Sequence, residues 1–176
     1  ATLFMPRLAK YMGWQNAFGV AMLPVLAVLL IFAWTAKDAP GERRKIRWSD
    51  YKALFAQPDT GWFCVFYSFT FCGFAGLASF LTMFYADQYQ LAKVSAGDLA
   101  TISVIAGSAL RPVGGWLSDR FGGYRLLLCV LLGTSMLLGS LMALPAVEVA
   151  ALQLTLTMGL LGMGNGAVFQ LVPQRF

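Results

Sequence analysis

Five stretches of the chain are apolar and long enough to cross a lipid bilayer as helices. Four contain no charged side chain and the fifth carries Arg111; they are residues 11–36, 60–86, 126–147, 149–174 and, with the arginine, 97–118. A spanning helix needs about 20 mostly apolar residues to match the hydrocarbon layer. The pattern therefore predicts an all-α, polytopic membrane bundle with about five transmembrane helices. Residues 1–10 are interpreted as the end of a preceding helix and a loop.

The connections between these stretches fall into two sets, because consecutive spans with short links alternate in direction. One set (residues 37–59, residues 118–125 and Arg175) contains nine cations, and the other (the N-terminal loop, residues 87–98 and a turn at Glu148) contains three. The nine are Lys37, Arg43, Arg44, Lys45, Arg47, Lys52, Arg120, Arg125 and Arg175, and the three are Arg7, Lys10 and Lys93. Cytoplasmic loops are rich in Lys and Arg, so the first set is predicted to be cytoplasmic.

The longest connection, residues 37–59, combines a polar linker with an amphipathic segment. Trp48, Tyr51 and Phe55 recur at spacings of three and four behind Ser49, a candidate N-cap. This spacing predicts a short helix on the inner membrane surface, with a partner-docking site as the alternative.

Composition supports a membrane protein and excludes several other classes. The chain is 59% hydrophobic and 12% charged, with a mean hydropathy of +0.68, whereas soluble domains carry about 25% charged residues. The net charge of +5 does not indicate nucleic-acid binding, because the cations lie between apolar spans. With no His and no paired catalytic groups, the sequence predicts no enzyme activity, metal or cofactor. Cys64, Cys72 and Cys129 are interpreted as small packing residues. The absence of an initiating Met leads us to expect an internal piece of a longer protein.

A glycine-rich turn follows the span that carries Arg111. Its pattern is G-x-x-x-D-R-x-G followed by a cation, and its residues are Gly114, Gly115, Asp119, Arg120, Gly122 and Arg125. The glycines allow close helix approach and a sharp reversal, and Asp119 is expected to lie against a neighbouring helix N-terminus. The segment resembles the loop signature of the major facilitator superfamily, with Gly123 at a position where many members have Arg.

That resemblance implies a division of the chain into three parts. The superfamily has twelve helices in two halves, so the chain would run from about helix 6 to helix 10. Residues 1–36 would then close the N-terminal half, residues 37–59 would connect the halves, and residues 60–176 would be part of the C-terminal half.

Arg111 is the strongest candidate for a binding residue. A charge inside the bilayer costs about 2.5 to 3.5 kcal/mol or more and needs a compensating partner. No carboxylate lies at its depth in the sequence, which favours a mobile anion as that partner. At about 1.5 Å of rise per residue, Tyr67, Phe71, Arg111 and Asn165 all lie roughly 3 to 9 Å to the cytoplasmic side of the middle of their spans. Tyr67 and Phe71 also share a helix face.

Longer motifs resemble the nitrate/nitrite porter family within the superfamily. They are Arg111-Pro-Val-Gly-Gly-Trp-Leu-Ser-Asp-Arg, Gly164-Asn-Gly-Ala-Val-Phe-Gln-Leu-Val-Pro and the pair Tyr67-x-x-x-Phe71. The resemblance implies a carrier of the bacterial inner membrane, functional as a monomer, in which one arginine from each half binds a small planar anion between aromatic side chains. Arg111 would be the arginine of the C-terminal half, and Tyr67 and Phe71 would line the site. Asn165 and Gln170 are amides within a span, which need partners and often face a cavity, so they are expected to line the site as well. The other aromatic residues of residues 60–86, Phe74 among them, are interpreted as lipid contacts and packing.

The sequence therefore predicts a secondary transporter of nitrate, nitrite or both, embedded in the lipid bilayer and working by alternating access. A carrier for another small anion is the first alternative. The second is a membrane scaffold in which Arg111 pairs with a partner subunit. Exchange and proton symport both stay open.

Overall fold

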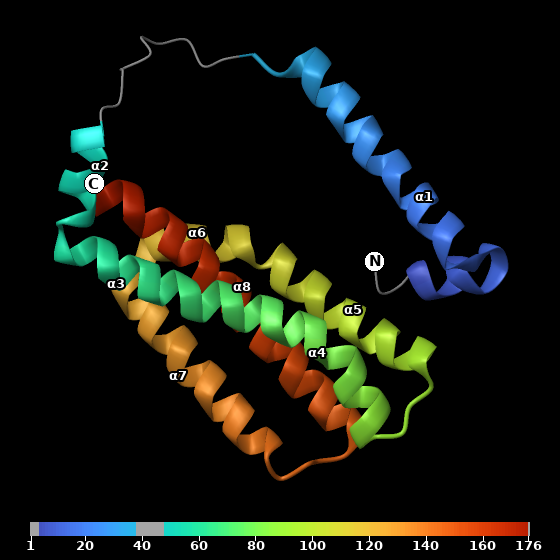
Figure 1. Ribbon diagram of the computed structural model, residues 1–176. Coiled ribbons are helices and arrows are strands. Elements are labelled where there is room, and N and C mark those ends of the chain that lie inside the picture. The colour runs from blue at the N-terminus through green and yellow to red at the C-terminus, as the bar shows by residue number, and fades with distance from the viewer. Residues whose placement is uncertain (1–3, 38–47, 176) are drawn as a thin grey trace. The chain divides into compact units, whose positions relative to one another are not determined.

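The computed structural model describes residues 4–37 and 48–175, and these residues form helices and no strand (Figure 1). The helices are α1 (Met5–Thr35), α2 (Trp48–Phe55), α3 (Pro58–Tyr67), the π-helix η1 (Ser68–Cys72), α4 (Gly73–Gln88), α5 (Lys93–Ala109), α6 (Arg111–Phe121), α7 (Gly123–Leu141) and α8 (Val147–Arg175). The predicted all-α class is confirmed. Helices dominate because a backbone in lipid must satisfy its own hydrogen bonds.

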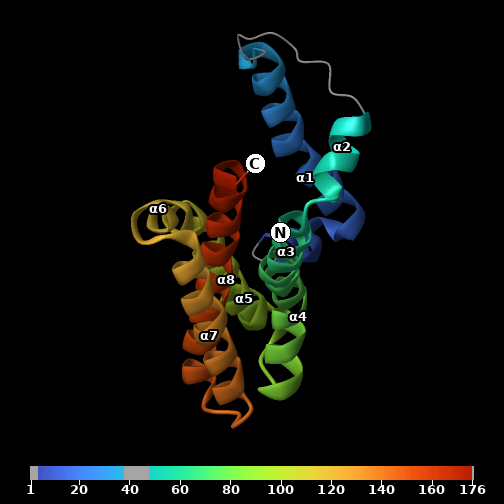
Figure 2. The same cartoon turned by 90° about the vertical axis from the view of Figure 1, so that its left-hand side faces the viewer.

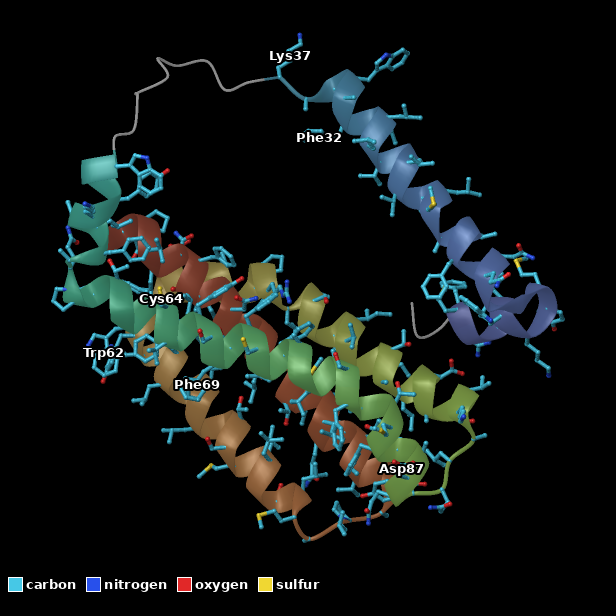
Figure 3. All side chains as sticks on the ribbon, viewed as in Figure 1. Phe32, Lys37, Trp62, Cys64, Phe69 and Asp87 are labelled. Carbon is cyan, nitrogen blue, oxygen red and sulfur yellow. The ribbon has the colours of Figure 1, made fainter. Side chains whose placement is uncertain are left out.

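The chain divides into two compact units, Ala1–Ala53 and Leu54–Phe176. In the first unit, α1 begins at Met5 and bends at Gly13, whose φ of 78° is a conformation that glycine adopts without strain. The prediction of a loop within residues 1–10 is therefore wrong, because the chain is helical from Met5 onward and the helix bends only at Gly13. Side chains such as Phe32 project outward along α1 (Figure 3), as expected of a helix that contacts lipid.

The predicted short helix after the polar linker is present as α2. It begins at Trp48, so Ser49 lies within the helix and not at its N-cap. The linker itself, residues 38–47, lies outside the described residues, and the assignment of residues 37–59 to a connection between two halves stays a prediction.

Four described helical segments are long and apolar enough to cross a membrane: Arg7–Thr35, Pro58–Gln88, Gly123–Leu141 and Val147–Gln174. They correspond to four of the five predicted spans. The fifth, residues 97–118, is divided between α5 (17 residues) and α6 (11 residues), which meet at Leu110. The break follows from Pro112, which lacks an N–H and cannot continue the hydrogen-bond ladder of α5.

Three of the predicted connections differ from those in the structure. The turn expected at Glu148 lies at residues 142–146, where Pro145 and the positive φ of Leu144 (46°) stop the helix, and Glu148 instead occupies the first turn of α8. An acidic side chain is favourable there because of the helix dipole. The loop expected over residues 87–98 is reduced to residues 89–92. The turn expected over residues 118–125 narrows to Gly122, where a φ of 89° favours glycine.

Helix α8 lies at the centre of the second unit. It packs against α5, α6 and α7 and against the segment from α3 to α4 (Figure 2). The buried core joins α4, α5 and α8 through Phe74, Leu81, Tyr85, Ala96, Ala100, Leu154, Met158 and Leu161. Any side chain on the central part of α8 is therefore positioned by several neighbours.

Glycines set the distance between α8 and the pair α5–α6. A Cβ at Gly162 would overlap the carbonyl oxygen of Gly107, and one at Gly114 would overlap the backbone of Met163. Small residues at such contacts allow membrane helices to approach until their backbones touch. The prediction of a close helix approach at Gly114 is confirmed.

We expect Gly162→Ala to destabilise the full-length protein by about 1 to 3 kcal/mol, because its methyl group would overlap a backbone atom that cannot move independently. The measurement is the midpoint of thermal unfolding in detergent. Gly76→Ala is the control, because nothing lies within 4 Å of a Cβ at that position. Equal midpoints for the two variants would contradict a packing role for Gly162.

Candidate functional site

Arg111 is the first residue of α6, directly after the break at Leu110. Its guanidinium carbon Cζ lies over the ring of Phe74, 4.7 Å from the ring centroid. Its Nε is buried and has no hydrogen-bond partner among the described residues. A Cβ at Gly166 would overlap the Arg111 carbonyl oxygen, so α8 contacts the backbone of this residue directly. Arg111 is thus held between α4 and α8 with an unused buried donor.

Tyr67 and Phe71 form the aromatic pair predicted from their spacing. Their rings are stacked, with centroids 5.3 Å apart and planes 6° from parallel. Phe169 of α8 adds a third ring, edge-on to Tyr67 at 5.3 Å and 78°. The expectation that Tyr67 and Phe71 share a helix face is confirmed, and Phe169 is an addition that the sequence pattern did not predict.

The π-helix η1 separates Tyr67 from α4. Thr70, at its centre, is fully buried, and its hydroxyl donates to the carbonyl oxygens of Phe66 (3.0 Å) and Tyr67 (3.2 Å). A π-helical turn interrupts the α-helical hydrogen-bond ladder, and a threonine hydroxyl can satisfy a carbonyl freed in this way. Turns of this kind occur often at functional sites. Hydropathy and helical spacing gave no prediction of this turn.

Asn165 of α8 faces the π-helix. Four residues earlier, Leu161 lies at Gly73, and four residues later, Phe169 contacts Tyr67, so the face between them points to Ser68–Cys72. Asn165 is 1% exposed, and its Oδ1 has no hydrogen-bond partner in the described part of the chain. Because the next residue, Gly166, touches Arg111, the amide lies at the level of the arginine.

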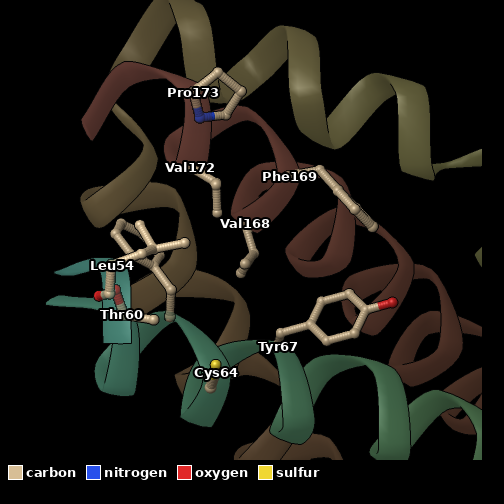
Figure 4. A pocket seen from close by; sticks show the side chains of 9 residues that line it. Leu54, Thr60, Cys64, Tyr67, Val168, Phe169, Val172 and Pro173 are labelled. Carbon is tan, nitrogen blue, oxygen red and sulfur yellow. The ribbon is translucent and has the colours of Figure 1, made fainter. Parts of the chain in front are cut away.

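A cavity of about 550 Å³ opens beside Tyr67 (Figure 4). Its lining comes from Leu54 of α2, from α3 and from the end of α8 and is mostly apolar, with Cys64 and Tyr67 on one side and Val168, Phe169 and Pro173 on the other. Tyr67 is the one predicted site residue that borders it. The cavity therefore adjoins the aromatic cluster, while Arg111 and Asn165 lie outside its lining.

The last turn of α6 is tied to the C-terminal end of α8. Asp119 Oδ1 accepts hydrogen bonds from Gln170 Nε2 at 2.6 Å and from Gln174 Nε2 at 3.2 Å. The expectation that Asp119 lies against a helix N-terminus is wrong: two side-chain amides near the C-terminal end of α8 supply the donors. This contact engages the amide nitrogen of Gln170 with the turn, and a role of Gln170 in binding an anion stays a prediction.

The remaining motif residues lie in α6 and at the start of α7. The guanidinium of Arg120 is over the ring of Trp116, 5.6 Å from its centroid. Gly115 approaches the Gly166 carbonyl, and Arg125 is exposed at the start of α7.

The prediction that the three cysteines are small packing residues is wrong. Cys64, Cys72 and Cys129 are free and exposed at the surface of the described chain. Cys64 lines the cavity beside Tyr67, and Cys72 and Cys129 are exposed on η1 and α7.

The sequence and the fold define the class of protein. The profile of the Major Facilitator Superfamily matches residues 1–175. The chain therefore belongs to this superfamily and is a multi-pass membrane protein, as its apolar helices also indicate.

Similar curated proteins narrow the class further. The chain is 28% identical to the probable nitrate/nitrite transporter NarK2 of Mycobacterium tuberculosis over 99% of this chain and 45% of that protein. It is 30% identical to the probable nitrate transporter NarT of Staphylococcus carnosus, over 100% of this chain and 45% of that protein. It is 28% identical to the nitrite extrusion protein of Bacillus subtilis, over 99% of this chain and 44% of that protein. These matches confirm the resemblance to nitrate/nitrite porters. The chain spans about half the length of these relatives. No solved structure matches it.

We expect Gln170→Leu to lower the unfolding midpoint of the full-length protein, because Asp119 loses its shorter hydrogen bond. A bond to a charged group is worth about 1.5 to 3 kcal/mol when buried, and exposure should reduce the loss here to about 1 kcal/mol. Gln174→Leu should cost less, since its bond is longer, and Gln88→Leu, at an exposed position at the end of α4, is the control. If Gln170→Leu raises the nitrate KM more than about tenfold without lowering the unfolding midpoint, the result would support a role of Gln170 in binding the anion.

Proposed function

We propose that this chain is part of a bacterial membrane carrier that moves nitrate, nitrite or both by alternating access. The observation that carries the proposal is Arg111, a cation in a membrane bundle whose buried Nε has no acceptor among the described residues. An unpaired buried charge is costly, so a permanent state without a partner is disfavoured. The names of the similar proteins support nitrate and nitrite as the compensating anions.

The chemistry of Arg111 fits a small planar oxyanion. A guanidinium presents donors in a rigid fork that can bind two oxygens at once, whereas a lysine presents one compact charge. The stacked pair Tyr67 and Phe71 supplies flat apolar walls that exclude water, which strengthens the charge pairing. The buried amide of Asn165 lies at the same level and adds a polar group to the proposed site.

Anion binding can be coupled to movement of the two halves. In the proposed mechanism a second arginine, from the N-terminal half outside this chain, faces Arg111 across the site. Without an anion the two like charges oppose closure, and a bound anion compensates both and lets the halves rock around the site. Gly114, Gly115, Asp119 and Arg120 of α6 would set how this helix moves against α8.

We expect Arg111→Gln in the full-length protein to abolish nitrate uptake into proteoliposomes, because the site loses its charge. Arg111→Lys should keep the charge but lose the bidentate fork. The loss of roughly 1.5 to 3 kcal/mol of binding free energy should raise the nitrate KM by about 10- to 100-fold. Lys93→Gln, an exposed cation outside the proposed site, is the control.

The same Arg111→Gln variant tests the scaffold alternative. A scaffold would lose assembly with its partner subunit and would have no nitrate flux to lose. Normal assembly and stability together with abolished flux would eliminate it, and unchanged nitrate flux would overturn the proposed function.

Substrate class is tested by counterflow. Proteoliposomes loaded with nitrate should exchange it for external nitrate or nitrite and much more slowly for acetate or formate, because the flat aromatic walls and the fork favour a small, planar inorganic anion. Faster exchange with a carboxylate would favour a carrier for organic anions.

A further inference from the structure

We propose that Phe74 is a positioning residue for Arg111: its ring fixes the guanidinium so that the N–H edge is presented to the anion. This inference rests on the proposed anion site. It concerns a side chain whose sequence context predicts only lipid contact or packing, and that the structure buries to 7% exposure beneath the arginine.

The ring of Phe74 is itself tightly held. A Cβ at Gly107 would lie 2.5 Å from Phe74 Cε2 and 2.6 Å from the Met158 carbonyl oxygen. The ring therefore occupies space that exists only because residue 107 is glycine. Phe74 also belongs to the buried core shared by α4, α5 and α8. A ring fixed from these directions provides a rigid surface for the side chain above it.

Gly107 and Arg111 adjoin the same ring from the two sides of the helix break at Leu110. A Cβ at Gly107 would lie 2.5 Å from Phe74 Cε2, and the Cζ of Arg111 lies 4.7 Å from the ring centroid. At the other end of the residue, Gly166 contacts the Arg111 carbonyl. Arg111 is thus fixed at its backbone by α8 and at its guanidinium by α4.

The electrostatics favour this arrangement. An aromatic face carries a negative potential that attracts a cation within about 6 Å of the centroid, and Cζ lies 4.7 Å away. On this side the guanidinium carbon therefore meets an aromatic ring and not a hydrogen-bond acceptor. The N–H donors point outward in the guanidinium plane, so an anion approaches them at the edge, which is the bidentate geometry. Because ring attraction replaces a carboxylate here, Arg111 keeps its positive charge uncompensated for the anion.

Phe74 also connects the arginine to the aromatic walls. It lies seven residues after Tyr67 and three after Phe71, on one continuous helical run through η1. One segment therefore carries the stacked rings and the ring beneath the arginine. This places wall and cation in a fixed relation that an independent loop could not give.

The test replaces Phe74 in the full-length protein with 3,4,5-trifluorophenylalanine, which keeps the shape of the ring but weakens its negative face. We expect the nitrate KM to rise about three- to tenfold with kcat changed less than about twofold, and 4-fluorophenylalanine to give an intermediate KM. The same substitutions at Phe80, exposed on α4, are the control and should leave KM unchanged. Phe74→Leu, which removes the aromatic face, should raise the KM at least as much.

The outcomes separate the two proposals. If Arg111→Gln abolishes nitrate uptake but the fluorinated series leaves KM flat, the positioning role is overturned and the anion site stands. The positioning role is also overturned if Phe74→Leu alone raises KM, since the effect would then be one of packing. If Arg111→Gln transports nitrate normally, the proposed function itself fails. Unfolding midpoints of the fluorinated proteins equal to that of the unmodified protein establish that the fold is retained.

Discussion

The structure depends on one constraint: a guanidinium placed inside an apolar helical bundle. Arg111 has a buried Nε without a partner in the described chain and an aromatic ring beneath its Cζ. A carboxylate in contact would neutralise the charge permanently, whereas a ring orients the cation and leaves its charge available. The local structure around Arg111, from the helix break at Leu110 to the backbone contact with Gly166, holds this charge in a defined place.

Glycine makes that placement achievable in lipid. Apolar surface gives little driving force for helices to associate when the solvent is itself apolar, so close packing has to provide it. Gly107, Gly114, Gly162 and Gly166 bring α5 and α6 into backbone contact with α8. Two of these glycines adjoin residues of the proposed site. Gly107 leaves space for the ring of Phe74, and Gly166 lies against the carbonyl of Arg111. Packing and binding therefore use the same residues.

Several errors in the sequence interpretation share a cause. Charged positions predict helix ends poorly in this chain: they led to a predicted turn at Glu148 and a predicted loop over residues 87–98. In the structure the backbone sets the helix ends. Pro145 and the positive φ of Leu144 end the helical region, and Glu148 lies in the first turn of α8. Charge alone also pairs Asp119 with a helix N-terminus, but Gln170 and Gln174 provide closer donors from a helix 51 and 55 residues away.

The sequence by itself determined the class of fold, the spans that run through residues 60–86 and 149–174, the shared face of Tyr67 and Phe71, and Arg111 as the candidate binding residue. Hydropathy and helical spacing are local properties, so they can be read from the order of residues. Only the tertiary structure revealed the π-helix at Ser68–Cys72 and the partners of Asp119, and only it distinguished Phe74 from the other aromatic residues of its helix. Phe74 lies seven residues after Tyr67, but which ring lies beneath the arginine depends on how α4, α5 and α8 pack. That packing is set by glycine contacts between residues far apart in the chain, which no local pattern encodes.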